Sequence, residues 1–235
     1  HDPTLIRTAS MPYRWFSFLL LVISALTYGL LATSLGYYGD DWPGFYTLIS
    51  GGYAAIVEHT SVDRPFWGAI LGGVYEILGD SPLAWQAYAI ATRWLSAIAF
   101  FWLLTLLWPS RLREVSILTI LFVVYPGILQ VSKAFTYGTI WLQLTICLVS
   151  FALMLLAARQ KVNVYKLTFV SILLAIANWN INEYFLGLEA LRPILLWTII
   201  SQGNRRNTMT SMVKAWGPYL GALAIYFLYR IFWST

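Results

Sequence analysis

Charged residues are scarce in this chain. Asp, Glu, Lys and Arg make up 11% of its 235 residues, whereas 59% are apolar. Such a chain has too little polar surface to cover itself in water, so the composition predicts an integral membrane protein. The formal charge of +5 does not indicate a nucleic-acid partner, because the basic residues stand in small groups between apolar runs. That pattern is typical of membrane topology.

Histidine and cysteine are almost missing as well. His1 and His59 are the two histidines, and both lie outside the long apolar runs. Histidine ligation of haem or chlorophyll within the spans is therefore excluded. Cys147 is the single cysteine, so the chain cannot form an internal disulfide. The sequence also contains no phosphate-binding glycine loop and no internal repeat.

Long apolar runs predict about seven membrane-spanning helices, since a helix needs about 20 residues to cross the bilayer. The first expected span, 15–35, carries no Asp, Glu, Lys, Arg or His. It exceeds the apolar region of about 7 to 15 residues that signal peptides have, so we expect a retained anchor. Six further spans are expected within 83–235, at 83–108, 115–132, 139–158, 167–182, 184–201 and 212–233.

Basic residues predict the orientation of these spans, because cytoplasmic connections carry an excess of Lys and Arg. We place the tail 1–14 in the cytoplasm, and the segment 36–82 and the C-terminus outside. The connections assigned to the cytoplasm contain Arg111, Arg113, Arg159, Lys161, Lys166, Arg205, Arg206 and Lys214. The chain 1–235 is then a single all-α transmembrane domain, expected in a bacterial cytoplasmic membrane with its active face outside.

Two short amphipathic helices are expected within the segment 36–82. Apolar residues recur at helical spacing over 45–57 and again over 67–78, and each stretch is too short to span. Proline is favoured at the first helical position, so the second helix should begin at Pro65 and the next span at Pro82. We predict two interfacial helices on the outer leaflet. A re-entrant hairpin without chemistry is the alternative.

Several short motifs follow one another along the chain. They are Asp40-Asp41 after the first span, Asp63-Arg64-Pro65-Phe66, Gly79-Asp80-Ser81-Pro82, Arg93-Trp94-Leu95-Ser96-Ala97 and Tyr125-Pro126-Gly127. In this order they resemble the GT-C class of membrane glycosyltransferases, especially bacterial relatives of protein mannosyltransferases and aminoarabinose transferases. The resemblance implies inverting transfer of a sugar from a polyprenyl-phosphate donor to an extracytoplasmic acceptor.

The resemblance gives Asp40 and Asp41 a catalytic role. A carboxylate within hydrogen-bond reach takes the proton of an acceptor hydroxyl as attack proceeds. One aspartate is thus the candidate base, while its neighbour holds a divalent metal ion, orients the acceptor or caps the first interfacial helix. Two solvated loop acids, or a helix cap without a catalytic role, are the structural alternative.

The leaving group would be a lipid phosphate, which a guanidinium binds through paired hydrogen bonds. Arg64 and Lys133 are the external candidates. Arg93 stands about ten residues into the second span, where a charge is costly unless it faces a cavity or a partner. Pairing of Arg93 with Glu183 or Glu189 is the equal alternative.

A second polar cluster contains Asn180 and Glu183, near the outer ends of the fifth and sixth spans. Its amides and aromatic rings either bind a sugar or headgroup, or form a turn anchored at the membrane interface. Further along, Glu189 and Arg192 are spaced three apart on one helix face and are expected to neutralise one another.

A hypothesis of another kind follows from the number of spans. Members of the GT-C class usually have more than seven, so the chain is alternatively a non-catalytic subunit of a larger membrane complex. Its partners would then be membrane lipids and other membrane subunits. A transporter is a weaker third hypothesis, because no pair of interrupted spans recurs in matching positions.

Overall fold

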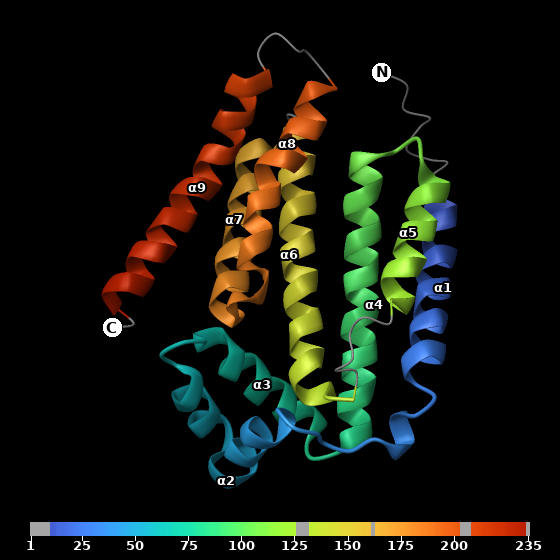
Figure 1. Ribbon diagram of the computed structural model, residues 1–235, viewed down its shortest axis with the longest axis vertical. Coiled ribbons are helices and arrows are strands. Elements are labelled where there is room, and N and C mark those ends of the chain that lie inside the picture. Colours follow the sequence, from blue (N-terminus) through green and yellow to red (C-terminus); the bar gives the residue numbers. More distant parts are fainter. Residues whose placement is uncertain (1–9, 126–131, 161–162, 203–207, 234–235) are drawn as a thin grey trace.

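The computed structural model describes residues 10–125, 132–160, 163–202 and 208–233, and this part of the chain consists of helices and their connections, without strands. Seven rods lie side by side and alternate in direction along the long axis of the molecule (Figure 1). They are α1 (Ser10–Tyr28), α4 (Pro82–Leu107), α5 (Leu112–Val124), α6 (Ala134–Gln160), α7 (Val164–Ile181), the 3-10 helix η3 (Glu183–Ala190) continued by α8 (Leu191–Ser201), and α9 (Thr208–Trp233).

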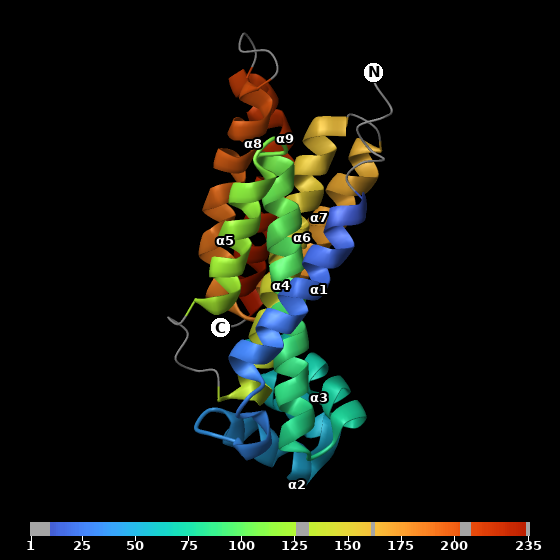
Figure 2. The same cartoon turned by 90° about the vertical axis from the view of Figure 1, so that its right-hand side faces the viewer.

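Two shorter helices lie together at one end of these rods. They are α2 (Asp41–Thr60) and α3 (Pro65–Leu78), and a 3-10 turn, η2 (Ala32–Ser34), leads toward them from α1. Both views place the pair at the end of the bundle where α4 and α6 begin (Figures 1 and 2). We call this the α2–α3 end of the bundle.

Helix α6 packs along both α4 and α7, and small polar residues join the helices. The Ser96 hydroxyl of α4 donates to the Trp141 carbonyl of α6 over 2.7 Å. Between α6 and α7, Ser150 and Ser171 each donate to the other's carbonyl, over 2.7 and 2.6 Å. Small side chains let helices approach closely within a bilayer, so these contacts suit transmembrane packing.

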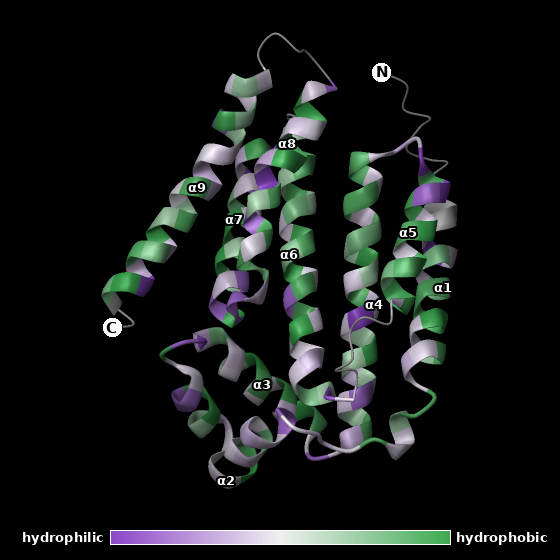
Figure 3. Ribbon diagram, viewed as in Figure 1, coloured by the Kyte–Doolittle hydropathy of each residue, from purple (hydrophilic) through white to green (hydrophobic). Residues whose placement is uncertain are grey.

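Four of the described helical segments are long and apolar enough to cross a membrane: Pro82–Leu107, Ala134–Arg159, Val164–Ile181 and Glu183–Ser201. They support the assignment as a membrane protein. Figure 3 shows the apolar character of these rods, with hydrophilic residues prominent in the segments around α2 and α3. Seven spans and their orientation remain predictions.

The other predicted spans differ from the helices observed. Helix α1 ends at Tyr28 and not at the predicted residue 35. Gly29 follows Tyr28, and glycine is a weak helix former. Helix α5 has 13 described residues, about 20 Å at about 1.5 Å per residue, against a hydrocarbon core of about 30 Å. The expected span 115–132 continues into residues 126–131, which lie outside the described residues.

The predicted helix starts at Pro65 and Pro82 are confirmed. Each proline lies in the first turn of its helix, and the hydroxyl of the preceding Ser81 accepts from the Ala84 N–H over 3.4 Å. Within α2, Gly52 has φ of 70° and interrupts the helix. Glycine adopts this conformation without steric cost, so α2 bends at this residue. The two amphipathic helices are therefore present, while their position on a membrane remains a prediction.

Candidate functional site

The Asp40 carboxylate forms an ion pair with Lys133, which directly precedes α6. The Nζ atom lies 2.8 Å from Asp40 Oδ2. This hydrogen bond raises the pKa of the Lys133 ammonium, which keeps it protonated. The absence of a side chain at Gly39 leaves space for Lys133, because a Cβ atom at Gly39 would lie 3.1 Å from Lys133 Cε. Gly39 also has φ of 51°. Asp40 itself remains largely exposed.

Asp41 is fully buried and faces a different group. Its Oδ1 accepts from the backbone N–H of Thr136 over 2.9 Å, whereas its buried Oδ2 has no hydrogen-bond partner within the described residues. Thr136 lies in the first turn of α6, whose N–H groups lack partners within the helix. Asp41 therefore caps α6. Burial raises the pKa of Asp41, against the opposing effect of the hydrogen bonds from Thr136.

Neither aspartate caps α2 through its side chain. Asp40 occupies the position before that helix without a side-chain capping bond, and Asp41 is its first residue. The negative charge of Asp41 instead lies at the N-terminus of α6, where the helix dipole favours it. The two adjacent carboxylates thus have separate surroundings: one is exposed and paired with a lysine, and the other is buried against a backbone amide.

Arg64 lies between two carboxylates. Its Nη2 is 3.3 Å from Glu183 Oε1, at the start of η3, and its Nε is 3.7 Å from Asp63 Oδ2. All three side chains are partly or largely exposed, so each pair contributes at most about 1 kcal/mol. A guanidinium held this loosely can exchange a carboxylate for a phosphate, because its planar fork of N–H donors binds two oxygens of either group.

Asp40 and Arg64 line the same pocket, which has a volume of about 270 Å³. It lies between α2, α3, the first turn of α6 and the junction of α7 with η3. His59, Thr136 and Asn182 also line it, and Phe135 and Trp67 form apolar parts of its wall. The pocket therefore combines the exposed carboxylate that precedes α2 with the cationic side chain that precedes α3.

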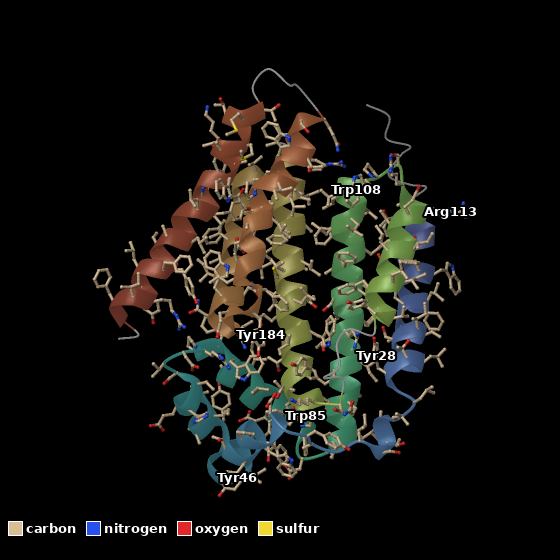
Figure 4. The ribbon with its side chains drawn as sticks, in the orientation of Figure 1. Tyr28, Tyr46, Trp85, Trp108, Arg113 and Tyr184 are labelled. Atoms are coloured by element: carbon tan, nitrogen blue, oxygen red, sulfur yellow. The ribbon has the colours of Figure 1, made fainter. Side chains whose placement is uncertain are left out.

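An apolar groove of about 310 Å³ adjoins this pocket. Tyr137 and Tyr184 line both. The remainder of the groove wall is apolar and comes from α5, α6 and η3: Phe122, Ile140, Trp141, Leu144 and Phe185. Figure 4 shows Tyr184 at the end of the bundle that faces α3. A molecule with a polar head and a hydrocarbon chain matches this pair of cavities.

Arg93 does not line the pocket. It is buried in α4 with its guanidinium over the ring of Tyr28, 3.5 Å from the centroid, and 4.4 Å from that of Trp141. Its Nε and Nη2 have no hydrogen-bond partner within the described residues. It faces a cavity of only about 20 Å³. Cation–π contacts, worth about 0.5 to 2 kcal/mol per ring, are thus the main interactions that offset the burial of the Arg93 charge.

The two glutamates considered as partners for Arg93 bind elsewhere. Glu183 pairs with Arg64, and Glu189 forms a short ion pair with Arg192, as the spacing predicted. The Trp179 indole donates to Glu189 over 3.2 Å, and Arg192 donates to the Ser150 hydroxyl over 2.8 Å. This buried network joins α6, α7 and α8.

Asn180 is directed toward its own helix, since its amide donates to the Ile176 carbonyl over 2.8 Å. Its neighbour Asn182 lines the pocket and caps η3 by accepting from the Tyr184 N–H over 3.3 Å. The polar cluster therefore contributes Asn182 and Glu183 to the pocket region. Among the described residues, no three His, Cys, Asp or Glu side chains gather closely enough to hold a metal ion.

Sequence reasoning missed several residues of the pocket, notably His59, Thr136, Tyr137 and Tyr184. His59 lies in the last turn of α2. Asp63, in the motif Asp63-Arg64-Pro65-Phe66, lies four residues after His59. This spacing was the sequence signal that could have linked His59 to the motif.

Comparison with known proteins gives no relative: no protein-family model, no curated protein and no solved structure matches this chain.

Proposed function

We propose that the chain is a glycosyltransferase module that transfers a sugar from a polyprenyl-phosphate donor to an acceptor hydroxyl. One observation carries this proposal: the pocket that holds Asp40 and Arg64 shares Tyr137 and Tyr184 with an apolar groove. The sugar phosphate would occupy the pocket and the prenyl chain the groove. The motif order that resembles GT-C enzymes gives the same substrate class.

Asp40 is the proposed general base, because it lines the pocket and is exposed. It accepts the proton of the acceptor hydroxyl while that oxygen bonds to the anomeric carbon. The bond between that carbon and the phosphate oxygen breaks on the opposite face, so configuration inverts and the lipid phosphate leaves. Lys133 positions the carboxylate through the 2.8 Å ion pair.

Arg64 is the proposed ligand of the departing phosphate. Its guanidinium lines the pocket, and its present partners Glu183 and Asp63 are exposed enough to be displaced. Charge develops on the phosphate as the bond breaks, and a preorganised cation stabilises that charge. Asp41 takes no part in proton transfer in this scheme, because it caps α6 and does not line the pocket.

The test is donor turnover by the purified chain in nanodiscs, measured as release of polyprenyl phosphate from a panel of polyprenyl-phosphate sugars with acceptor present. Arg64→Gln should lower turnover by about 10²-fold, the typical loss for one transition-state donor. Arg113→Gln, an exposed arginine on α5 away from the pocket, is the matched control and should turn over donor normally. Equal rates in both variants would refute the role of Arg64.

A non-catalytic subunit of a membrane complex is the second candidate function. The observation in its favour is that the charged pocket residues Asp40 and Arg64 already have partners, Lys133 and Glu183. In that case these ion pairs serve only to attach α2 and α3 to the bundle. A wild-type chain that is inert toward every donor, yet retained in a purified membrane complex, would favour this function.

A further inference from the structure

A second groove lies at the end of the bundle opposite α2 and α3. It has a volume of about 370 Å³ and lies between α6, α7 and α9. Ala157 and Ala158 of α6 line it with side chains too small to fill the space, and Phe169, Ile172 and Pro218 complete an apolar wall. The groove is thus suited to a hydrocarbon chain.

One basic residue lines this groove, and two more directly follow lining residues in the chain. Lys214 lines it and is exposed, Arg159 follows the lining residue Ala158, and Lys166 follows the lining residue Tyr165. Figure 1 places the end of α6 and the beginnings of α7 and α9 at this same end of the bundle. None of these three cations forms an ion pair with a residue in the described part of the chain.

Acidic residues are missing from the segments that build the groove. The sequence contains no Asp or Glu over residues 134–182 and none after Glu189. The one acid close to α8, Glu189, is already paired with Arg192 in the bundle interior. The positive charge at the groove is therefore not balanced by the helices that form it, and a negatively charged ligand is complementary to it.

An exposed tyrosine lies at the edge of the groove. Tyr165 lines it and is 91% exposed, which is common for tyrosine at the boundary between hydrocarbon and headgroups. The Thr168 hydroxyl, one helical turn further along α7, lines the groove as well. Polar and basic groups thus lie at one edge, and apolar side chains continue along the helices.

We propose that this groove is a binding site for an anionic phospholipid. One acyl chain lies in the groove beside Ala157 and Ala158, and the phosphate lies near Lys214 and Lys166. The proposal is independent of the glycosyltransferase function, since the site lies at the other end of the bundle and shares no lining residue with the pocket of Asp40.

The test is native mass spectrometry of the detergent-purified chain with an equimolar mixture of phosphatidylglycerol and phosphatidylcholine. Wild type should retain phosphatidylglycerol preferentially. Lys214→Gln should lower that preference about fivefold, the effect of one basic residue near an anionic headgroup. Lys214→Arg should restore it. The preference should also fall with added salt, because the attraction is electrostatic and solvent-exposed.

Arg113→Gln is the control, since it removes an exposed cation at the same end but on α5, on the other side of the bundle from α9 (Figure 4). It should leave the preference unchanged. Ala158→Leu, which fills the groove, should reduce retention of both lipids. Equal retention of the two lipids by wild type would overturn the proposal. So would an equal loss in Lys214→Gln and Arg113→Gln, both of which change exposed residues and should fold normally.

Discussion

The Asp41 carboxylate accepts a hydrogen bond of 2.9 Å from the backbone N–H of Thr136, 95 residues further along the chain. This contact attaches the beginning of α2 to the beginning of α6. The two neighbouring aspartates thus have different surroundings, because the buried side chain of Asp41 binds the N-terminus of α6 while Asp40 lines the pocket.

Asp41→Asn should be at least as stable as wild type at pH 7. Burial raises the pKa of Asp41 above its ordinary value of 3.8, so the folded state binds this proton more tightly than the unfolded state. Its contribution to stability is therefore fully present below pH 3.8 and is lost as pH rises through the raised pKa. Asparagine keeps an oxygen for the Thr136 N–H and has no charge to bury.

The measurement is the thermal unfolding midpoint in detergent between pH 3 and pH 7. The difference between Asp41→Asn and wild type should grow in favour of the variant as pH rises. Asp40→Asn is the matched control at the exposed neighbour. A variant that is clearly less stable than wild type at pH 7 would contradict the expectation that burial of the Asp41 charge costs more than its hydrogen bond with the Thr136 N–H contributes.

Glu189→Ala should destabilise the bundle by about 3 to 5 kcal/mol, because it leaves the buried Arg192 guanidinium without its counter-charge. Removing the exposed partner in Glu183→Ala should cost less than about 1 kcal/mol, as for other solvent-exposed ion pairs. Unfolding in a mixed-micelle denaturant titration compares the two directly. Similar losses for both variants would mean that Arg192 is compensated by its ring contacts with Phe151 and Tyr219.

Gly39→Ala should cost about 1 to 2 kcal/mol, the usual penalty for an L-residue in the left-handed region. The added Cβ would also lie 3.1 Å from Lys133 Cε and disturb the ion pair with Asp40. Gly36→Ala is the control in the same loop, because no atom lies within 4 Å of its added Cβ. Unfolding midpoints should fall for the first variant only.

Local features of the fold could be predicted from the sequence. Proline preferences located the starts of α3 and α4, and a spacing of three located the Glu189–Arg192 pair. These features depend on residues close together in the chain. The end of α1 was predicted poorly, since apolar residues continue past Tyr28, its last helical residue.

Contacts between residues far apart in the chain could not be predicted from the sequence. The ion pair between Asp40 and Lys133 joins residues 93 apart, and it depends on how α2 packs against the first turn of α6. Gly44 permits that packing, because a Cβ there would lie 2.9 Å from the Phe135 ring. Arg93 illustrates the same limit. The sequence indicates that a charge within the span is costly, but the contacts of its guanidinium with the rings of Tyr28 and Trp141 depend on tertiary structure.

The most direct test of the proposed function is donor turnover in Asp40→Asn compared with Asp41→Asn, measured side by side with wild type in nanodiscs. Loss of a general base typically lowers the rate by about 10²- to 10⁴-fold, so Asp40→Asn should lose turnover to this extent. Asp41→Asn should retain most of it, since asparagine can still cap α6. Full turnover in Asp40→Asn, or a larger loss in Asp41→Asn, would contradict the account.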